Sequence, residues 1–507
     1  MKNILKVLLL SIPFWGLTSC DNGFDELNIN KTAATSVNPV FILNNATINC
    51  TYSPGTVIYE IGIVQQMVSP NSGVLTGANF NQDSRDNTVQ NWQKYYRTVI
   101  RNTQDVIDQT KNLPARSNLF NMARILQAYA SMVTTDSYGD IPYEEAGKGY
   151  TQQIVLPKYN TQQAVYAGII KELTDASTAL DAAKTIETAD VLYAGNIALW
   201  KKFANSLLLR AGMRLSKVDA AQAQSVVGKA LAAGVMELNT ENAMVRHDAN
   251  FVNAVGNMLN STESANIYMA APFVDFLKKT NDPRLKSIAV RYVGAKSGPE
   301  QVASRASSEP AVQIGMPFGF DNSTISAEVT KNKLASFYDF TQVDRTRMAR
   351  NTAPNFLVTA AQTQLLLAEA AQKGWVTGTT AEAYFNRGVK LHMEQLAIHD
   401  ANSAVAPAAI TAYLTENSFK TATALEQINT QYWVASFLNG PEAFANFRRS
   451  GFPVLSPNPF PGKGIKGTFI RRLTYPNSEI SVNSTNVKEA ISRMGADDLD
   501  TKVWWDK

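Results

Sequence analysis

Long segments in which apolar residues recur every three or four positions constrain the fold of this chain most. The strongest patterns cover residues 119–133, 198–215 and 356–371. In the second segment Trp200, Phe203 and Leu207 fall on the apolar stripe, and the basic residues fall outside it. This spacing is typical of helices that bury one face, so these aromatic residues are expected to pack in a core. Weaker helical patterns cover residues 91–111, 164–183, 220–233, 381–396 and 422–437.

The helical segments follow one another in pairs separated by short breaks, which is typical of tetratricopeptide-like hairpins. Residues 236–354, and the tail from residue 451, are instead rich in Gly, Ser, Asn and Pro. Within the tail, residues 467–476 have the composition of a strand. The sequence predicts a mainly α protein, in which a tetratricopeptide-like helical hairpin scaffold carries a loop-rich inserted ligand-binding face. The expected divisions are a scaffold at 40–235 and 355–450, an insert at 236–354 and an irregular segment at 451–507.

The N-terminus has the features of an exported lipoprotein. Two lysines precede an apolar run that is too short to span a bilayer and ends in Leu17-Thr18-Ser19-Cys20. This ending resembles the bacterial lipobox, in which the cysteine becomes the first mature residue and carries lipid. We therefore expect a signal peptide at 1–19, lipid on Cys20 and a polar tether at 20–39.

Charge and cysteine content exclude several classes of function. The chain has 47 basic and 43 acidic residues, and removal of the two signal lysines leaves 45 against 43. Basic residues are interspersed with acidic ones, so nothing indicates a nucleic-acid partner. If Cys20 is acylated, Cys50 is the only remaining thiol, and its apolar surroundings favour a buried residue over a nucleophile.

A secreted glycoside hydrolase is the enzymatic alternative, because Asp136, Asp140, Glu144 and Glu145 cluster within ten residues. A turn is the simpler interpretation, with Asp140 accepting backbone N–H bonds beside Gly139. The sequence contains no nucleophile elbow, zinc-protease motif or phosphate-binding loop. His392 and His399 lack a third ligand at metal spacing, and a structural Ca²⁺ has no loop motif to support it. We expect no enzymatic activity and no cofactor.

Several strings together resemble the SusD/RagB family of outer-membrane nutrient-binding lipoproteins. They are DSYGDIPYEEA (136–146), WKKFANSLLLR (200–210), AEAAQKGW (368–375), RRSGFP (448–453) and RRLTYPNSE (471–479). The resemblance implies lipid anchoring at the outer membrane, facing the cell exterior. It also implies a TonB-dependent SusC-like transporter as partner, and an oligosaccharide or, as in RagB-like members, a peptide as ligand. Arg448 and Arg449 are expected to pair with carboxylates, anion binding being the alternative.

Two loops combine flat apolar side chains with amide and charged groups, as carbohydrate sites require. The first, residues 71–92, corresponds to a loop that contacts ligand in members of the family that this chain resembles. The second, residues 314–322, lies in the insert. Packing under the scaffold is the alternative role for Trp92, Phe318 and Phe320, and Phe80 is the preferred stacking residue. The candidate ligand-binding residues are Asn79, Phe80, Asn81, Asp83, Arg85, Trp92, Phe318, Phe320 and Asn322.

Overall fold

The computed structural model describes residues 37–71 and 77–507. The chain divides into two units, Met1–Asn38 and Pro39–Lys507, and every helix and strand of the described residues lies in the second unit. The predicted signal peptide, the lipid-bearing Cys20 and nearly all of the tether lie outside the described residues. These assignments stay predictions.

Helices make up most of the second unit, which confirms the predicted mainly α fold. The helices before residue 235 are α2 (Pro39–Ile48), α3 (Pro54–Ile58), α4 (Glu60–Ile63), α5 (Arg85–Lys94), α6 (Arg101–Thr110), α7 (Ser117–Tyr138), α8 (Gly149–Gln152), α9 (Gln162–Ala179), α10 (Ile197–Arg214) and α11 (Ala220–Ala233). The later helices are α12 (Ala254–Asn260), α13 (Ala271–Lys279), α14 (Arg284–Ile288), α15 (Ser326–Lys331), α16 (Ala360–Gln372), α17 (Ala381–His399), α18 (Pro407–Glu416), α19 (Ala424–Ala435), α20 (Gly440–Ser450), α21 (Asn477–Val482) and α22 (Ser484–Met494). A π-helical turn, Tyr95–Ile100, joins α5 to α6.

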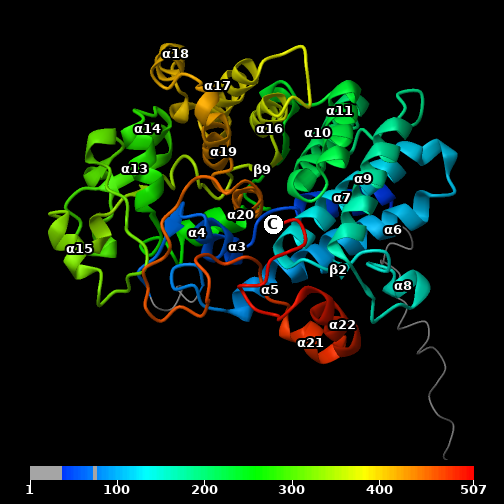
Figure 1. Cartoon of the computed structure of the whole chain (residues 1–507), viewed down its shortest axis with the longest axis horizontal. Helices are drawn as coiled ribbons and strands as arrows, with labels where there is room; N and C mark the ends of the chain where they lie inside the picture. The colour runs from blue at the N-terminus through cyan, green and yellow to red at the C-terminus, as the bar shows by residue number, and fades with distance from the viewer. Residues whose placement is uncertain (1–36, 72–76) are drawn as a thin grey trace, which may run out of the picture. The chain divides into compact units, whose positions relative to one another are not determined.

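The scaffold is built from neighbouring helix pairs, and α6, α7, α9, α10 and α11 lie side by side in Figure 1. Helices α16, α17 and α19 form a second packed group. Polar N-cap residues precede these helices at the point where the periodic apolar pattern starts. Asn196 accepts a bond from the Leu199 N–H at 3.1 Å at the start of α10, and Thr380 does the same for the Ala383 N–H of α17. As predicted, Trp200, Phe203 and Leu207 are fully buried.

The start of the predicted helix at 356–371 is different in the structure. Strand β9 (Asn355–Val358) pairs antiparallel with β4 (Ala243–Val245), and α16 begins only after Thr359. The Thr359 side chain accepts a bond from the Gln362 N–H, and the Gln362 side chain accepts one from the Thr359 N–H, which makes a capping box. From Ala360 to Ala370 every residue of α16 is buried, as expected of a central helix.

Short strands lie between the helices, several of them in the loop-rich insert. Besides β4 and β9 they are β1 (Met67–Val68), β2 (Ile141–Pro142), β3 (Tyr159–Asn160), β5 (Tyr268–Met269), β6 (Ala289–Tyr292), β7 (Ala306–Ser307) and β8 (Gln342–Val343). They form the antiparallel pairs β1–β5, β2–β3 and β4–β9 and a sheet in the order β7-β6-β8. The strand expected at 467–476 is wrong, since these residues hold no strand. Their backbone instead bonds at separate points, with Arg471 N–H to Leu499 O and Leu473 N–H to Ser137 O.

Buried arginines tie the scaffold together. Arg449 pairs with Glu369 of α16 at 2.6 Å, as predicted, and lowers the pKa of this carboxyl although burial alone would raise it. Arg448 instead donates to the backbone carbonyls of Asp136 and Arg471, so carboxylate pairing is wrong for this residue. Cys50 is fully buried, and burial raises the pKa of its thiol.

Candidate functional site

The structure brings the two predicted ligand loops together. The Asn79 side chain donates to the carbonyl of Phe320 at 3.1 Å and accepts from the Gly319 N–H at 3.0 Å. It also donates to the Ser69 carbonyl at 2.8 Å. One buried amide thus fixes the insert against the loop that precedes α5.

A third segment from the C-terminal tail completes this surface. The buried Asn458 side chain donates to the carbonyls of Ala78 and Asn79 at 3.0 and 2.6 Å. Gly319 has φ +82°, and a Cβ there would lie 2.8 Å from Asn458 Oδ1, so the close approach requires glycine. We call the surface formed by residues 77–82, 314–322 and 456–464 the loop face.

Aromatic rings lie at different depths in the loop face. Phe80 is only 7% exposed and stacks on Phe460 with ring centroids 4.1 Å apart. Phe318 is equally buried, in a small apolar cluster with Tyr268 and other insert residues. Phe320 and Phe460 are half-buried, so these two rings are the ones that an incoming ligand can reach.

Polar residues at the edge of the loop face have distinct roles. Asn322 is exposed and lies within a tight turn that begins at Asp321. Bonds from Ser323 and Thr324 lower the pKa of Asp321 to about 2, so this turn keeps its negative charge. Asn81 is buried with φ +49°, and its carbonyl accepts from the Gly464 N–H at 2.9 Å.

The other three candidates lie where the chain packs against the C-terminal segment. Asp83 accepts from the Thr474 hydroxyl at 2.8 Å, and Arg85 pairs with Asp497 at 2.8 Å. Trp92 is buried among rings, packed against Tyr96, Tyr138, Tyr159 and Tyr475. In the structure these three residues pack against the C-terminal segment or bond to it. That they contact a ligand stays a prediction.

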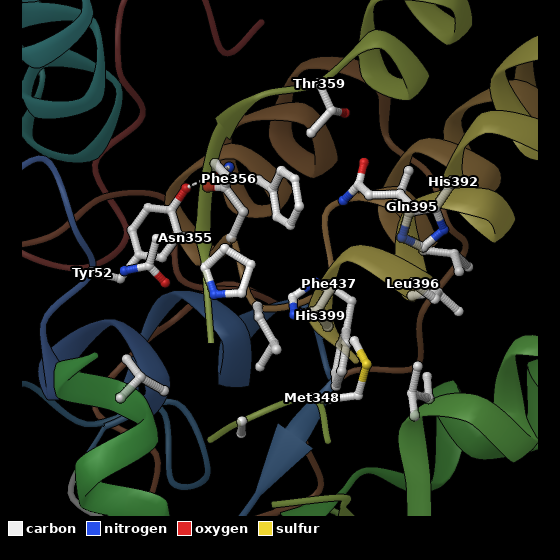
Figure 2. Close-up of a pocket in the computed structure, with 18 of the residues that line it drawn as sticks. Tyr52, Met348, Asn355, Phe356, Thr359, His392, Gln395, Leu396, His399 and Phe437 are labelled. Carbon is white, nitrogen blue, oxygen red and sulfur yellow. Dashed lines mark hydrogen bonds between the residues drawn. The ribbon is translucent and has the colours of Figure 1, made fainter. Parts of the chain in front are cut away.

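A separate cavity lies inside the protein between β9, α12 and α17. Figure 2 shows Tyr52 and Phe356 on one side of it and His392 and Gln395 on the other. Its volume of about 40 Å³ holds about three water molecules, and no sugar residue fits there. This cavity is therefore not the site of a glycan.

The histidines of this cavity are poor metal ligands. His392 Nδ1 accepts from Arg284 at 2.9 Å, because a guanidinium can only donate. Burial, with Arg284 beside it, holds the pKa of His392 well below its usual range, and burial lowers that of His399 to about 4. Within residues 37–71 and 77–507 no three His, Cys, Asp or Glu side chains are grouped to hold a metal ion.

The acidic cluster serves the fold. Asp136 is buried against Arg214 at 3.1 Å, and Asp140 accepts from the Gln162 N–H at 2.9 Å, the backbone bond that the sequence predicts. Glu145 accepts from the Lys158 N–H at 2.8 Å. Three of the four carboxylates are thus bonded to neighbouring protein groups, in agreement with the simpler interpretation of this segment as a turn.

Asn458 and Phe460 are the residues of the loop face that sequence reasoning missed. The composition of the tail indicates only a turn-rich segment, although PNPFP places an aromatic residue between prolines at residues 457–461. This phenylalanine lies in a turn-dense segment and outside any helical stripe, and that was the available signal.

Comparison with known proteins adds to this geometry. The SusD-like family, described as "Starch-binding associating with outer membrane", matches residues 30–476. The chain belongs to the SusD-like family. This confirms the resemblance found in the sequence, and the family is associated with the outer membrane. None of the helices in the described ranges of this SusD-like protein has the length and apolar character that crossing a bilayer requires.

Solved structures resemble this SusD-like protein over almost its whole length. A chitin-binding protein is 30% identical, with a TM-score of 0.82 over 92% of this chain and 100% of the other. A Bacteroidetes SusD-like protein, AC2a, is 26% identical, with a TM-score of 0.81 over 93% and 100%. A chitin-binding SusD homolog from Flavobacterium johnsoniae is 25% identical, with a TM-score of 0.75 over 92% and 97%. Comparison with curated proteins gives no match.

Proposed function

We propose that this SusD-like protein is a lipid-anchored glycan-binding protein on the outer face of the outer membrane. In this proposal Cys20 carries the lipid, and the loop face binds an oligosaccharide and passes it to a TonB-dependent SusC-like transporter. The observation that carries the proposal is the pair of half-buried rings, Phe320 and Phe460, held in place by Asn79 and Asn458. Flat rings beside fixed amides suit the apolar faces and hydroxyls of sugars.

The relatives reported above support a proposal for the chemical class of the glycan. Two of the similar structures are chitin-binding, one of them 30% identical to this chain. We therefore propose oligosaccharides of N-acetylglucosamine as the ligand class. Their acetamido groups offer both a donor and an acceptor to amide side chains such as that of Asn322.

Calorimetry with N-acetylglucosamine oligosaccharides tests the binding site. Loss of one stacking ring in Phe320→Ala or Phe460→Ala should weaken binding by about 1 kcal/mol, roughly fivefold, with the fold unchanged. Tyr150→Ala is the matched control, because Tyr150 is 96% exposed and lies on α8, outside the loop face. Equal affinity in wild type and both variants would move the site elsewhere.

Two outcomes would contradict the proposed function itself. Titration with peptides in place of glycans would identify a RagB-like protein if only the peptides bound. Mass spectrometry of the glycan after incubation would identify a hydrolase if shorter products appeared. The engaged carboxylates Asp136, Asp140 and Glu145 support the expectation that the glycan is recovered intact.

Anchoring and partnership need their own tests. Cys20→Ala should leave the protein out of the membrane fraction, and membrane recovery equal to wild type would contradict the lipid anchor. Pull-down from solubilised outer membrane should recover a β-barrel of transporter size with the wild-type protein. Recovery of the protein alone, where other such pairs survive, would count against the transporter.

A further inference from the structure

A second concave site lies on the helical side of the molecule, at the C-terminal end of α13. Helices α17, α18 and α19 close around it, and its volume is about 270 Å³. Phe276, Phe385 and Tyr413 give it aromatic walls, and Thr430 and Gln431 contribute polar groups. We call it the α13–α19 pocket. It shares no residue with the loop face.

The deep wall of this pocket is held rigidly. Gln431 donates to the Tyr413 hydroxyl at 2.8 Å and accepts from Arg284 at 2.6 Å. Arg284 itself is fixed by Asp282 at 2.5 Å and lies 5.8 Å from the Tyr413 ring centroid. Burial raises the pKa of Tyr413 to about 12, so the phenol stays neutral. Such a pre-organised wall loses little conformational freedom when a ligand binds.

The rim is polar and electrically balanced. Lys420 and Glu426 are exposed there, and neither forms an ion pair with any other described residue. One cation and one anion offer donors and acceptors without net charge. Thr430 adds a hydroxyl that bonds no side chain among the residues described. Aromatic walls, with polar groups whose charges balance, suit an uncharged ligand that carries hydroxyls.

We propose that the α13–α19 pocket binds one sugar residue, as a second contact site for the glycan bound at the loop face. The inference rests on the proposed glycan function. The volume of about 270 Å³ lies close to the ~300 Å³ at which ligand sites begin, which is enough room for one sugar residue. Phe276 is half-buried and offers the ring that stacks on the apolar face of this sugar.

The two sites are linked through a short helix. The first residue of α13, Ala271, donates its N–H to the carbonyl of Met316 at 2.8 Å, in the segment that carries Phe318 and Phe320. Phe276 lies five residues further along, about 7.5 Å of helix rise. A second site on the same body raises the overall affinity for a polymer that carries many copies of the sugar.

Equilibrium dialysis with the N-acetylglucosamine trisaccharide tests this inference by counting sites. Thr423 is exposed on the pocket rim, so Thr423→Trp fills the pocket without entering the core. The wild type should bind two ligands per chain, and Thr423→Trp should bind one. Phe320→Ala should weaken binding at the loop face and leave the α13–α19 pocket unchanged. Thr415→Trp, on an exposed position of α18 outside the pocket, is the matched control and should bind two.

A milder variant and a second probe complete the test. Thr430→Val keeps the side-chain shape and removes one hydroxyl, and should weaken the pocket site about fivefold. The second site would be overturned if the wild type bound one ligand per chain and only loop-face substitutions weakened that binding. The proposed function would then still stand. A chain that binds no glycan at all would overturn the proposed function. Displacement of the sugar from the pocket by alanine, a zwitterion that Lys420 and Glu426 could hold, would overturn the ligand class.

Discussion

In the scaffold the buried residues Arg210, Arg214 and Arg449 bond to buried carboxylates, whereas at the loop face amide side chains bond to backbone carbonyls. Glu442 of α20 accepts from Arg214 at 2.7 Å, lies 3.2 Å from Arg210, and is fully buried with both. At the loop face the neutral side chains of Asn79 and Asn458 join separate segments by hydrogen bonds to backbone carbonyls. A charged pair in the interior is costly to break, whereas the loss of a neutral hydrogen bond made by an amide side chain costs less. The comparison predicts a rigid scaffold that carries an adjustable binding surface.

The largest effect is expected from Glu442→Ala in the scaffold. The substitution leaves the buried Arg210 and Arg214 without their shared carboxylate and should lower the free energy of unfolding by about 3–5 kcal/mol. Denaturant unfolding measures it. Lys286→Ala removes an exposed pair with Glu309 and should change stability by no more than about 0.5 kcal/mol. Similar losses in both variants would remove the distinction between interior and surface charge.

The parts of this fold that sequence predicted are those fixed by local pattern. The helix expected at 220–233 has the observed bounds, because an apolar stripe and its cap need only neighbouring residues. The helix predicted to start at 356 is wrong over its first residues, because the partner strand β4 lies more than a hundred residues away in sequence. Non-local pairing of this kind leaves no local trace in an apolar segment.

The same distinction between local pattern and non-local contact applies to the candidate site. Composition, together with the family resemblance for residues 71–92, identified the two loops that Asn79 joins. Asn458 escaped notice because its bond to Ala78 connects positions 380 residues apart. Whether an aromatic ring lies at the bottom or the edge of a loop depends on such contacts. For this reason composition could not separate the buried Phe80 from the half-buried Phe320.

Glu60 tests the scaffold through pH. Burial raises the pKa of this carboxyl from 4.5 to about 7, against the opposing bonds from Ser137 and Asn91. The folded state therefore holds the proton more tightly than the unfolded state. Its contribution to stability is complete below pH 4.5 and is lost as pH rises to about 7, by roughly 3 kcal/mol. Unfolding measured across this range should show the loss in wild type and not in Glu60→Gln. Equal pH slopes in the two proteins would contradict this assignment.

Asn458→Ala should loosen the loop face and spare the scaffold. It removes the bonds to the carbonyls of Ala78 and Asn79, which become open to water once the segment moves. Amide hydrogen exchange at residues 77–82 should become about tenfold faster, roughly 1.4 kcal/mol of local stability, with the unfolding midpoint almost unchanged. Asn486→Ala is the control, because this exposed amide donates to Leu156 outside the loop face. A fall in the midpoint as large as that of Glu442→Ala would show that the face and the scaffold unfold together.

The smallest effect is expected at the exposed edge, from Asn322→Ala. Asn322 lies beside the Asp321 turn, whose bonds to Ser323 and Thr324 do not involve the Asn322 side chain. Its replacement should leave unfolding unchanged within about 0.5 kcal/mol. If the amide bonds the glycan, affinity for N-acetylglucosamine oligosaccharides should fall by about 1 kcal/mol in calorimetry, roughly fivefold. The control Asn332→Ala, on the same insert, removes an amide that already bonds Glu328 O at 2.8 Å and should not change affinity. A loss of stability without a loss of affinity would make Asn322 part of the supporting structure, and the contacting edge of the loop face would then consist of Phe320 and Phe460 alone.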